Sequence, residues 1–561
     1  MGQPPPEQRE HPHSAPSPKA MWTPLRHRLF RALWIAQLVA NTGTWMQTVG
    51  AQWLMGDLGG GALAIALVQT ATTLPVFLLV VPAGALGDIL DRRRLLLASQ
   101  VVTFAGAASL AALTAAGIMT PSLLLALTGT MAVGQAFAMP TFQAIQPELV
   151  SLDEIPQAAL LNGANGNVAR AVGPALGGVL IALAGPAATF ALNALSFLGV
   201  MLVLFVWNRP PDHRPLGAEH IRDAVRAGAR YVRSAPEFAS VLLCAVMFTF
   251  CASGMWALLP ALARDPLGLG AGGYGLLLAA VGFGAVAGAV ALPAVRARAG
   301  PNTVVAASTI GYALAMIVVG TVTTVPVVIT ALVGAGLAWI AVLSTLGASA
   351  QLLLPEWARA RSLAYYQLVF MGGQAVGSLV WGTVAERLNL PVAFVVPAAV
   401  LILGTPVGAL RIPLPKGGLD MRSVRHYPEP PEDMEHDRGP LLVVVEWRVG
   451  TENAEAFLEV MRQVGRARRR TGATMWSLFE DMEEPTLYVE TFTVQTAQEH
   501  LRQHLERGTA MDQELDLRAL RLVMEGTFPY VRHLIWAYAP RPGQEMEEPQ
   551  FKSLISLLRP R

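Results

Sequence analysis

Charged residues are scarce in this sequence, and their scarcity indicates its class. Asp, Glu, Lys and Arg make up 14% of the 561 residues, whereas soluble globular chains carry about 25%. Hydrophobic residues make up 53%. Most of the chain is therefore expected to lie in a lipid bilayer rather than in water.

Cysteine and the residue patterns of reactive sites are also sparse. The two cysteines, Cys244 and Cys251, fall in one apolar segment, where a helix would hold them about 10 Å apart, too far for a disulfide. Apart from one histidine pair in the C-terminal part, no metal-ligand spacing, catalytic constellation or cofactor motif occurs. No basic patch with interleaved aromatic residues indicates nucleic acid as a partner. Residues 1–24 begin without the apolar core of a signal peptide and are expected to be disordered.

Long apolar runs, in contrast, are abundant. Between about Leu29 and Leu410 they are about 18–26 residues long, the length with which a helix crosses the hydrocarbon core. They predict an all-α membrane part of twelve transmembrane helices in two six-helix halves, residues 25–207 and 238–411. The expected spans are 29–54, 62–86, 95–117, 121–142, 157–183, 187–207, 238–262, 273–294, 302–322, 325–348, 361–385 and 391–411.

The remaining segments read as soluble. The connector 208–237 between the halves predicts an amphipathic surface helix. After Ile412 the composition changes to a proline-rich linker, residues 412–438. Residues 439–540 then show the pattern βαββαβ, which predicts a small α+β ferredoxin-like domain, and residues 541–561 form a tail.

Arginines indicate the orientation of the spans. The connectors on the side of the N-terminus carry Arg92–Arg94 and several further arginines, whereas those on the opposite side carry Arg264 and Arg387. Because short cytoplasmic loops are enriched in Lys and Arg, both termini and the C-terminal domain are expected in the cytosol.

The most distinctive connector is Gly84-Ala-Leu-Gly-Asp-Ile-Leu-Asp-Arg-Arg-Arg94, between the second and third spans. Gly84 allows two helices to approach closely. Asp88 is expected near the start of the third span, where a carboxylate suits the helix dipole and can pair with Arg92 or another arginine.

This connector resembles the loop motif of the major facilitator superfamily. Gly84, Leu86, Asp88, Arg92 and Arg93 match that motif, while Ile89 and Asp91 depart from it. The resemblance implies that this conformational motif, Gly84 with the charge cluster Asp88, Asp91, Arg92 and Arg93, stabilises one of two access states.

A second motif lies in the fifth span. Gly173-Pro174-Ala-Leu-Gly177-Gly178 resembles an element of the exporters of the superfamily. Pro174 is expected to bend the helix, because it removes a backbone donor, and the glycines permit close packing. The combination of the two motifs favours an exporter over an importer.

Polar residues within the spans predict a substrate path. Arg170 is expected at or somewhat past mid-membrane, where a cation is costly and indicates function, either by contacting an anionic substrate or by pairing structurally. A polar face on the first span and amides on other spans could line the same space. The candidates are Asn41, Trp45, Gln47, Gln135, Asn162, Arg170, Gln367 and Gln374.

No Asp or Glu lies near the middle of a predicted span. A proton antiporter usually carries an intramembrane carboxylate, so proton coupling is implied here by the family resemblance alone. Asp88, Asp91 or Glu386 would be its candidates.

Several further segments, among them 36–47, 140–149 and 377–382, are similar to the bacterial branch that includes enterobactin exporters. This likeness covers about residues 25–410 and implies a location in the bacterial inner membrane. The C-terminal part resembles an extension on some members of that branch, and its element order resembles small dimeric α/β-barrel domains.

The C-terminal domain holds two histidines at metal-ligand spacing. His500 and His504 stand at i,i+4 on one predicted helix. No third ligand accompanies them, so a solvated helix face is expected instead of a metal site. We expect the domain to pair with itself or to regulate transport rather than to act as an enzyme.

These patterns together predict a secondary transporter that exports a small molecule by alternating access between its two halves. Two other hypotheses stay open. The chain could be a membrane sensor or scaffold that acts through its C-terminal domain, or an importer on the same fold.

Overall fold

The computed structural model describes residues 22–207, 232–411, 414 and 440–536, apart from some side chains within those ranges. Residues 1–21 of the segment predicted to be disordered, most of the connector with its amphipathic helix, nearly all of the linker, and the tail lie outside the described residues. Thr23 and Pro24, at the end of that segment, belong to a short 3-10 helix, Thr23–Arg26.

Twelve long helices make up the membrane part of the described residues. The first half comprises α2 (Arg28–Asp57), α3 (Ala62–Ile89), α4 (Arg92–Ala115), α5 (Pro121–Leu149), α6 (Ile155–Ala184) and α7 (Pro186–Val206). The second half comprises α9 (Pro236–Arg264), α10 (Ala271–Arg298), α11 (Pro301–Thr321), α12 (Val325–Leu352), α13 (Glu356–Arg387) and α14 (Leu390–Arg411).

Ten of these helices are long and apolar enough to cross a membrane. α2 is not among them, because polar residues interrupt its apolar sequence, and α14 contributes a shorter apolar helix, Leu390–Pro406. Proline opens α5, α7, α9 and α11, at a position where its missing N–H costs nothing. The predicted helical membrane architecture is therefore present.

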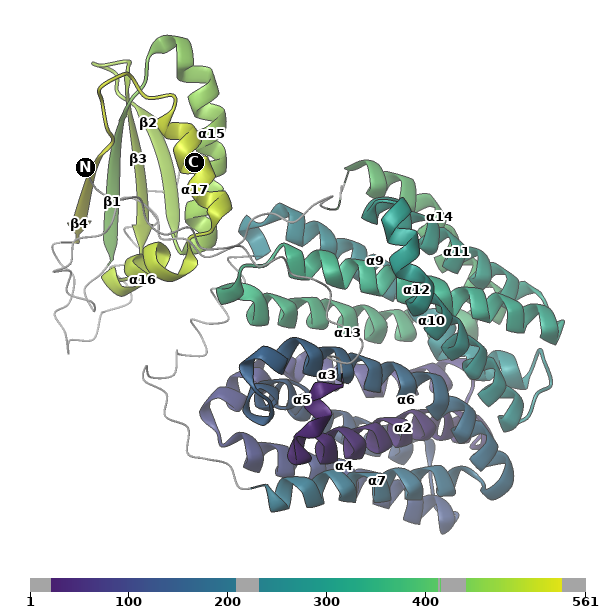
Figure 1. Ribbon diagram of the computed structural model, residues 1–561. Helices are drawn as coiled ribbons and strands as arrows, with labels where there is room; N and C mark the ends of the chain where they lie inside the picture. The colour runs from purple at the N-terminus through teal and green to yellow at the C-terminus, as the bar shows by residue number, and fades with distance from the viewer. Residues whose placement is uncertain (1–21, 208–231, 412–413, 415–439, 537–561) are drawn as a thin grey trace.

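Each half has its own apolar core. In the first half the core includes Phe30, Leu96 and Phe190, and in the second it includes Phe238 and Tyr312. The two halves adjoin mainly where α3 packs on α13 and α6 packs on α10. Figure 1 shows this seam between the purple-to-blue half and the teal-to-green half.

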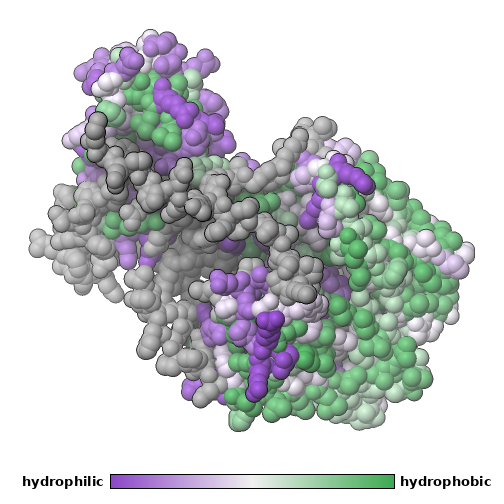
Figure 2. All heavy atoms as spheres, in the orientation of Figure 1, coloured by the Kyte–Doolittle hydropathy of each residue, from purple (hydrophilic) through white to green (hydrophobic). Residues whose placement is uncertain are grey.

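The outer surface of the bundle is apolar. Figure 2 shows broad green areas over the helices, and side chains such as Leu183, Leu202 and Leu403 are largely exposed. A surface of this kind is suited to lipid tails.

The two ends of the bundle are named here by their arginines. The Arg264 end is the end at which α2 and α9 finish and α3 and α10 begin. The Arg92 end is the opposite one, at which α3 finishes and α4 begins.

The C-terminal domain has the predicted βαββαβ order. Its elements are β1 (Leu441–Arg448), α15 (Ala454–Thr471), β2 (Met475–Glu480), β3 (Leu487–Val494), α16 (Ala497–Arg502), a π-helix (Gln503–Arg507), α17 (Ala510–Leu520) and β4 (Tyr530–Ile535). The sheet is antiparallel with strand order β2-β3-β1-β4. Trp447, Phe457 and Phe492 belong to its core.

Candidate functional site

An ion pair joins the two halves at the Arg264 end. The Nη2 atom of Arg264, at the end of α9, lies 2.7 Å from Oδ1 of Asp57, at the end of α2. The same nitrogen donates to the carbonyl oxygen of Trp53 at 3.0 Å. The guanidinium carbon lies 4.4 Å from the centre of the Trp53 ring, a cation–π geometry. We call Asp57, Trp53 and Arg264 the latch.

The seam between α3 and α13 adds polar contacts on the same side of the bundle. The backbone N–H of Leu63 donates to Glu386 Oε2 at 3.3 Å. Further along, Gln69 Nε2 donates to Gln374 Oε1 at 3.4 Å. Of the predicted path residues, Gln374 thus lies buried within the seam.

The predicted helix-bend motif lies where α6 meets its neighbours. A Cβ atom on Gly173 would come 2.6 Å from Trp45 Cβ, and one on Gly178 would come 2.6 Å from the Cα atom of Gly275 on α10. Gly177 approaches Met46 of α2 in the same way. α6 continues through Pro174 as one helix. The motif therefore allows close backbone approach both within the first half and across the seam.

Arg170 lies beside the same part of the seam. Its guanidinium carbon is 5.3 Å from the centre of the Trp45 ring. Its Nε atom is buried and has no hydrogen-bond partner among the residues that the structure describes. Arg170 and Trp45, both assigned to the path from sequence, are thus in contact.

A chain of indole rings leads from Trp45 into the second half. The Trp45 and Trp256 ring centres are 6.2 Å apart, and those of Trp256 and Trp339 are 5.4 Å apart. The sequence analysis did not select Trp256 or Trp339, because nothing in the spacing of isolated aromatic residues indicates that rings from α9 and α12 meet.

The other predicted path residues are dispersed. Asn41 donates to Asn165 Oδ1 at 2.9 Å, so it links α2 to α6. Gln47 accepts a hydrogen bond from Asn193 and is buried between helices of the first half, so its contacts favour a structural role over the path role proposed from sequence. Half-buried positions are occupied by Gln135, Asn162 and Gln367.

The predicted charge cluster at the Arg92 end is organised differently from the sequence expectation. α3 continues to Ile89, so Asp88 lies near the end of that helix. The prediction that Asp88 lies near the start of the next helix is therefore wrong. The cap of α4 is Asp91, whose side chain accepts from the backbone N–H of Arg94 at 2.8 Å. Gly84 also lies within α3.

The arginines of this cluster bind two other helices of the first half. Arg92 Nη1 lies 2.9 Å from Glu148 Oε1 on α5. Arg93 donates to the carbonyl oxygens of Leu204 and Phe205 at 2.8 and 2.7 Å, which satisfies acceptors at the end of α7. The cluster therefore connects α4, α5 and α7.

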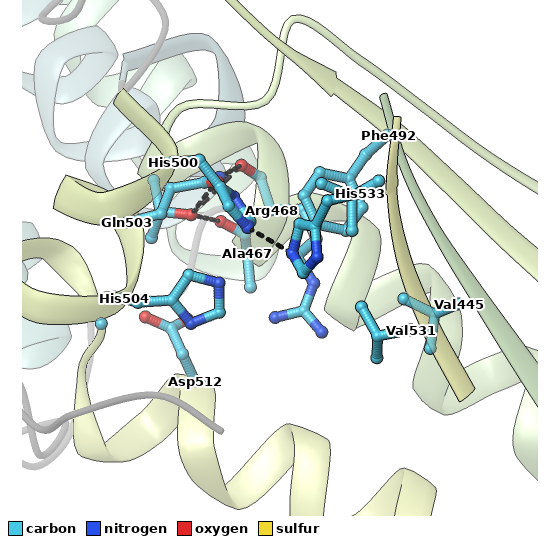
Figure 3. A pocket seen from close by; sticks show the side chains of 13 residues that line it. Val445, Ala467, Arg468, Phe492, His500, Gln503, His504, Asp512, Val531 and His533 are labelled. Atoms are coloured by element: carbon cyan, nitrogen blue, oxygen red, sulfur yellow. Dashed lines mark hydrogen bonds between the residues drawn. The ribbon is translucent and has the colours of Figure 1, made fainter. Parts of the chain in front are cut away.

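The C-terminal domain encloses a small cavity of about 30 Å³ between its sheet and its helices. Figure 3 shows His500, His504 and His533 around it, with Arg468 beneath. His500 and His504 are buried, so the solvated face predicted for them is wrong. His500 packs against Phe492 of β3 and His533 of β4, and the His504 ring packs on that of His500. Among the described residues no group of three or more His, Cys, Asp or Glu could hold a metal ion.

Hydrogen bonds determine the tautomer of His500. Gln503 donates through Nε2 to Arg468 O and Thr471 Oγ1, so its Oε1 accepts from His500 Nδ1 at 3.1 Å. His500 Nε2 is then the acceptor toward His533 Nε2, also at 3.1 Å. Burial lowers the pKa of His500 to about 4, with His533 and Arg468 adding to the decrease and Gln503 opposing it.

A buried ion-pair network supports this cavity. Burial alone would lower the pKa of Arg468, but the carboxylates of Asp516 and Glu490 hold it above its usual value. Glu490 also accepts from the indole nitrogens of Trp447 and Trp476. Because the charge of Arg468 is paired with the carboxylates of Asp516 and Glu490, we interpret the network as structural.

Comparison with known proteins gives a family match over most of the chain. A family model described as "Transmembrane secretion effector" matches residues 19–541. The Enterobactin exporter EntS of Citrobacter koseri is 26% identical over 414 residues, which cover 72% of this chain and 95% of that protein. The Staphyloferrin A transporter of Staphylococcus aureus is 30% identical over 164 residues, 29% of this chain and 41% of that one.

Solved transporter structures share the fold. A POT family transporter in complex with 5-aminolevulinic acid superposes with a TM-score of 0.58 at 13% identity, covering 69% of this chain and 96% of that chain. A bacterial homologue of the human lysosomal transporter Spinster, in an inward-facing and occupied conformation, gives a TM-score of 0.55 at 14% identity, with 69% and 97% coverage.

Proposed function

The chain belongs to the transmembrane secretion effector family of the major facilitator superfamily, and from this premise we propose that it exports a small molecule by alternating access. The two six-helix halves and their seam supply the architecture that such a cycle needs. The observation that carries the proposal is the set of contacts between the halves toward the Arg264 end, headed by the latch.

The direction of export depends on the orientation of the bundle. The arginine bias supports a cytosolic Arg92 end in the bacterial inner membrane, with the latch on the outer side. In that orientation the latch holds the outer side closed. The observed arrangement then corresponds to a state that receives substrate from the cytosol.

Arg170 is proposed as the principal contact for an anionic substrate. Its buried Nε lacks a hydrogen-bond partner among the described residues, and its positive charge is met by the face of Trp45. A buried cation of this kind is costly unless an anion or another acceptor compensates it. Siderophores, drugs and metabolites are the substrate classes considered, and the named relatives favour a siderophore.

Proton coupling is proposed to act through Glu386. Of the three carboxylates considered from sequence, Glu386 lies at the contact between the halves, where it accepts from Leu63 N–H. A protonated carboxyl accepts that hydrogen bond less well, so protonation from the outer side would loosen the seam. Asp91 instead caps α4 and is a structural residue in this scheme.

The C-terminal domain is proposed to mediate self-association or regulation. The strand register sets Tyr530, Arg532 and Leu534 of β4 on one face of the sheet. Tyr530 and Leu534 are largely exposed. Removing residues 439–561 would abolish dimers if this face joins two chains, as measured by light scattering on detergent-solubilised protein.

Transport by reconstituted vesicles tests the proposal. Inside-out vesicles with an imposed proton gradient should accumulate a candidate siderophore, and R170Q should reduce that accumulation at least about tenfold, given the usual contribution of hydrogen bonds to charged groups. A sensor or scaffold would show no accumulation with any substrate. An importer would accumulate substrate only in right-side-out vesicles.

A further inference from the structure

Three buried N–H donors without hydrogen-bond partners lie along one run of side chains that leads from the seam into the second half. They are Arg170 Nε, Trp256 Nε1 and Trp339 Nε1, and each is unpartnered among the residues that the structure describes. Trp45 connects them: Arg170 lies over its ring, and its ring centre is 6.2 Å from that of Trp256. Leaving buried donors unsatisfied is costly, so a run of three indicates an absent acceptor.

Other tryptophans of the bundle show that this arrangement is not general. Trp381 donates its indole N–H to the carbonyl oxygen of Phe250 at 2.8 Å. Trp34 donates to the carbonyl oxygen of Leu161 at 3.0 Å. The indole donors of Trp34 and Trp381 are therefore satisfied by backbone carbonyls, whereas those of Trp256 and Trp339 have no partner among the described residues.

The cluster also presents aromatic faces from both halves. Trp45 belongs to α2 of the first half, and Trp256 and Trp339 belong to α9 and α12 of the second. Phe370 of α13 adds a further ring, 6.3 Å from Trp339. Rings of this kind bind flat, unsaturated groups by stacking.

We propose that Trp45, Trp256, Trp339 and Arg170 form the recognition site for a flat aromatic anion. Its ring lies between Trp45 and Trp256, its charge faces Arg170, and its remaining acceptor atoms take the indole N–H groups. This inference rests on the proposed transport function and adds the chemical class of the substrate.

The dimensions of the ring pair connect binding to movement. A ring stacked on both faces needs about 3.5 Å on each side, or about 7 Å between the flanking rings. The Trp45 and Trp256 centres are 6.2 Å apart, with their planes inclined by 46°. Insertion of the ligand therefore requires the halves to shift by about 1 Å and the rings to turn. Binding of the ligand between Trp45 and Trp256 would therefore change the packing of the two halves against each other.

Binding of radiolabelled 2-naphthoate to the full chain in lipid nanodiscs tests this site. Wild-type protein should bind 2-naphthoate at least about tenfold more tightly than cyclohexanecarboxylate, which lacks the aromatic ring, or 2-naphthamide, which lacks the charge. W256F and W339F keep a ring and remove one donor each, so each should weaken binding about 3- to 10-fold. W381F is the matched control and should bind like wild type.

Two results would overturn the assignment. One is equal binding of 2-naphthoate and cyclohexanecarboxylate by a protein that still transports a substrate in vesicles, which leaves the proposed function intact. The other is a loss in W381F as large as in W256F and W339F, which marks a general packing effect. Selective binding of 2-naphthoate without transport of any substrate would instead support the site and refute the transport proposal.

Discussion

Breaking the latch should shift the protein toward the state that is open at the Arg264 end. R264A removes the ion pair with Asp57, the stacking on Trp53 and the hydrogen bond to the Trp53 carbonyl oxygen. The side chains of Arg264 and Asp57 are 28% and 43% exposed, so the ion pair contributes only about 0.5–1 kcal/mol. The cation–π contact adds about 0.5–1 kcal/mol.

The total loss of about 2 kcal/mol, including a share for the hydrogen bond, corresponds to about a 30-fold change in the equilibrium between the two access states. D57N keeps the cation–π contact and should change the equilibrium only about 2- to 5-fold. The double variant D57R/R264D restores an ion pair but not the original stacking, so it should recover part of the wild-type population.

Spin-label distances across the Arg264 end measure this shift. Ile118, after α4, and Thr323, after α11, are exposed on opposite halves and accept labels once Cys244 and Cys251 are replaced by alanine. Double electron–electron resonance should show a longer-distance population in R264A. R387A removes a neighbouring arginine of the same end and is the matched control. An unchanged distance distribution in R264A, or an equal change in R387A, would refute the latch.

Three further outcomes are expected. G178A should reduce vesicle transport severely, because its Cβ would lie 2.6 Å from the backbone of Gly275, whereas G166A on the same helix meets nothing within 4 Å and should transport normally; equal activities would contradict the close-packing role. R170K should retain part of the transport that R170Q loses, since it keeps the charge but not the planar donor set; equal loss in both would point to shape rather than charge. The C-terminal domain should lose stability as the pH falls from about 6.5 toward 4. Unfolded His500 binds a proton near pH 6.5 and folded His500 only near pH 4, so the loss in the free energy of unfolding is about 3 kcal/mol at most. Hydrogen exchange of residues 497–535 in the full chain should show this loss, and an equal loss in H500Q would assign the effect to another group.

Much of the architecture was accessible from sequence because lipid imposes simple rules. A helix must satisfy its own backbone and span a fixed thickness, so apolar run length predicted ten of the spans, while α2 and α14 are less clearly apolar. The element order of the C-terminal domain followed from strand and helix periodicity. The end of α3 was less accessible. The charged residues of the connector suggested that the helix ends near residue 86, whereas it continues through Asp88 to Ile89.

The candidate site was only partly accessible. Arg170 stood out because a cation within an apolar run is rare, and Trp45 was selected from the polar face of α2. Trp256 and Trp339 resembled ordinary core aromatic residues, since their unpartnered donors arise from the packing of distant helices. The ion pair of Asp57 with Arg264 was also identified only from the structure. The opposite charges at the ends of the first and seventh spans could have indicated it from sequence.

The charge cluster at the Arg92 end has a mechanical consequence. Asp91 caps α4, Arg92 reaches α5 and Arg93 holds the end of α7. Bonds of this kind cross-brace three helices, so the first half resists bending at that end. A half that is cross-braced in this way moves as a rigid body. If it rotates, a displacement of about 1 Å at the Trp45–Trp256 pair is accompanied by a larger displacement at the ends of its helices.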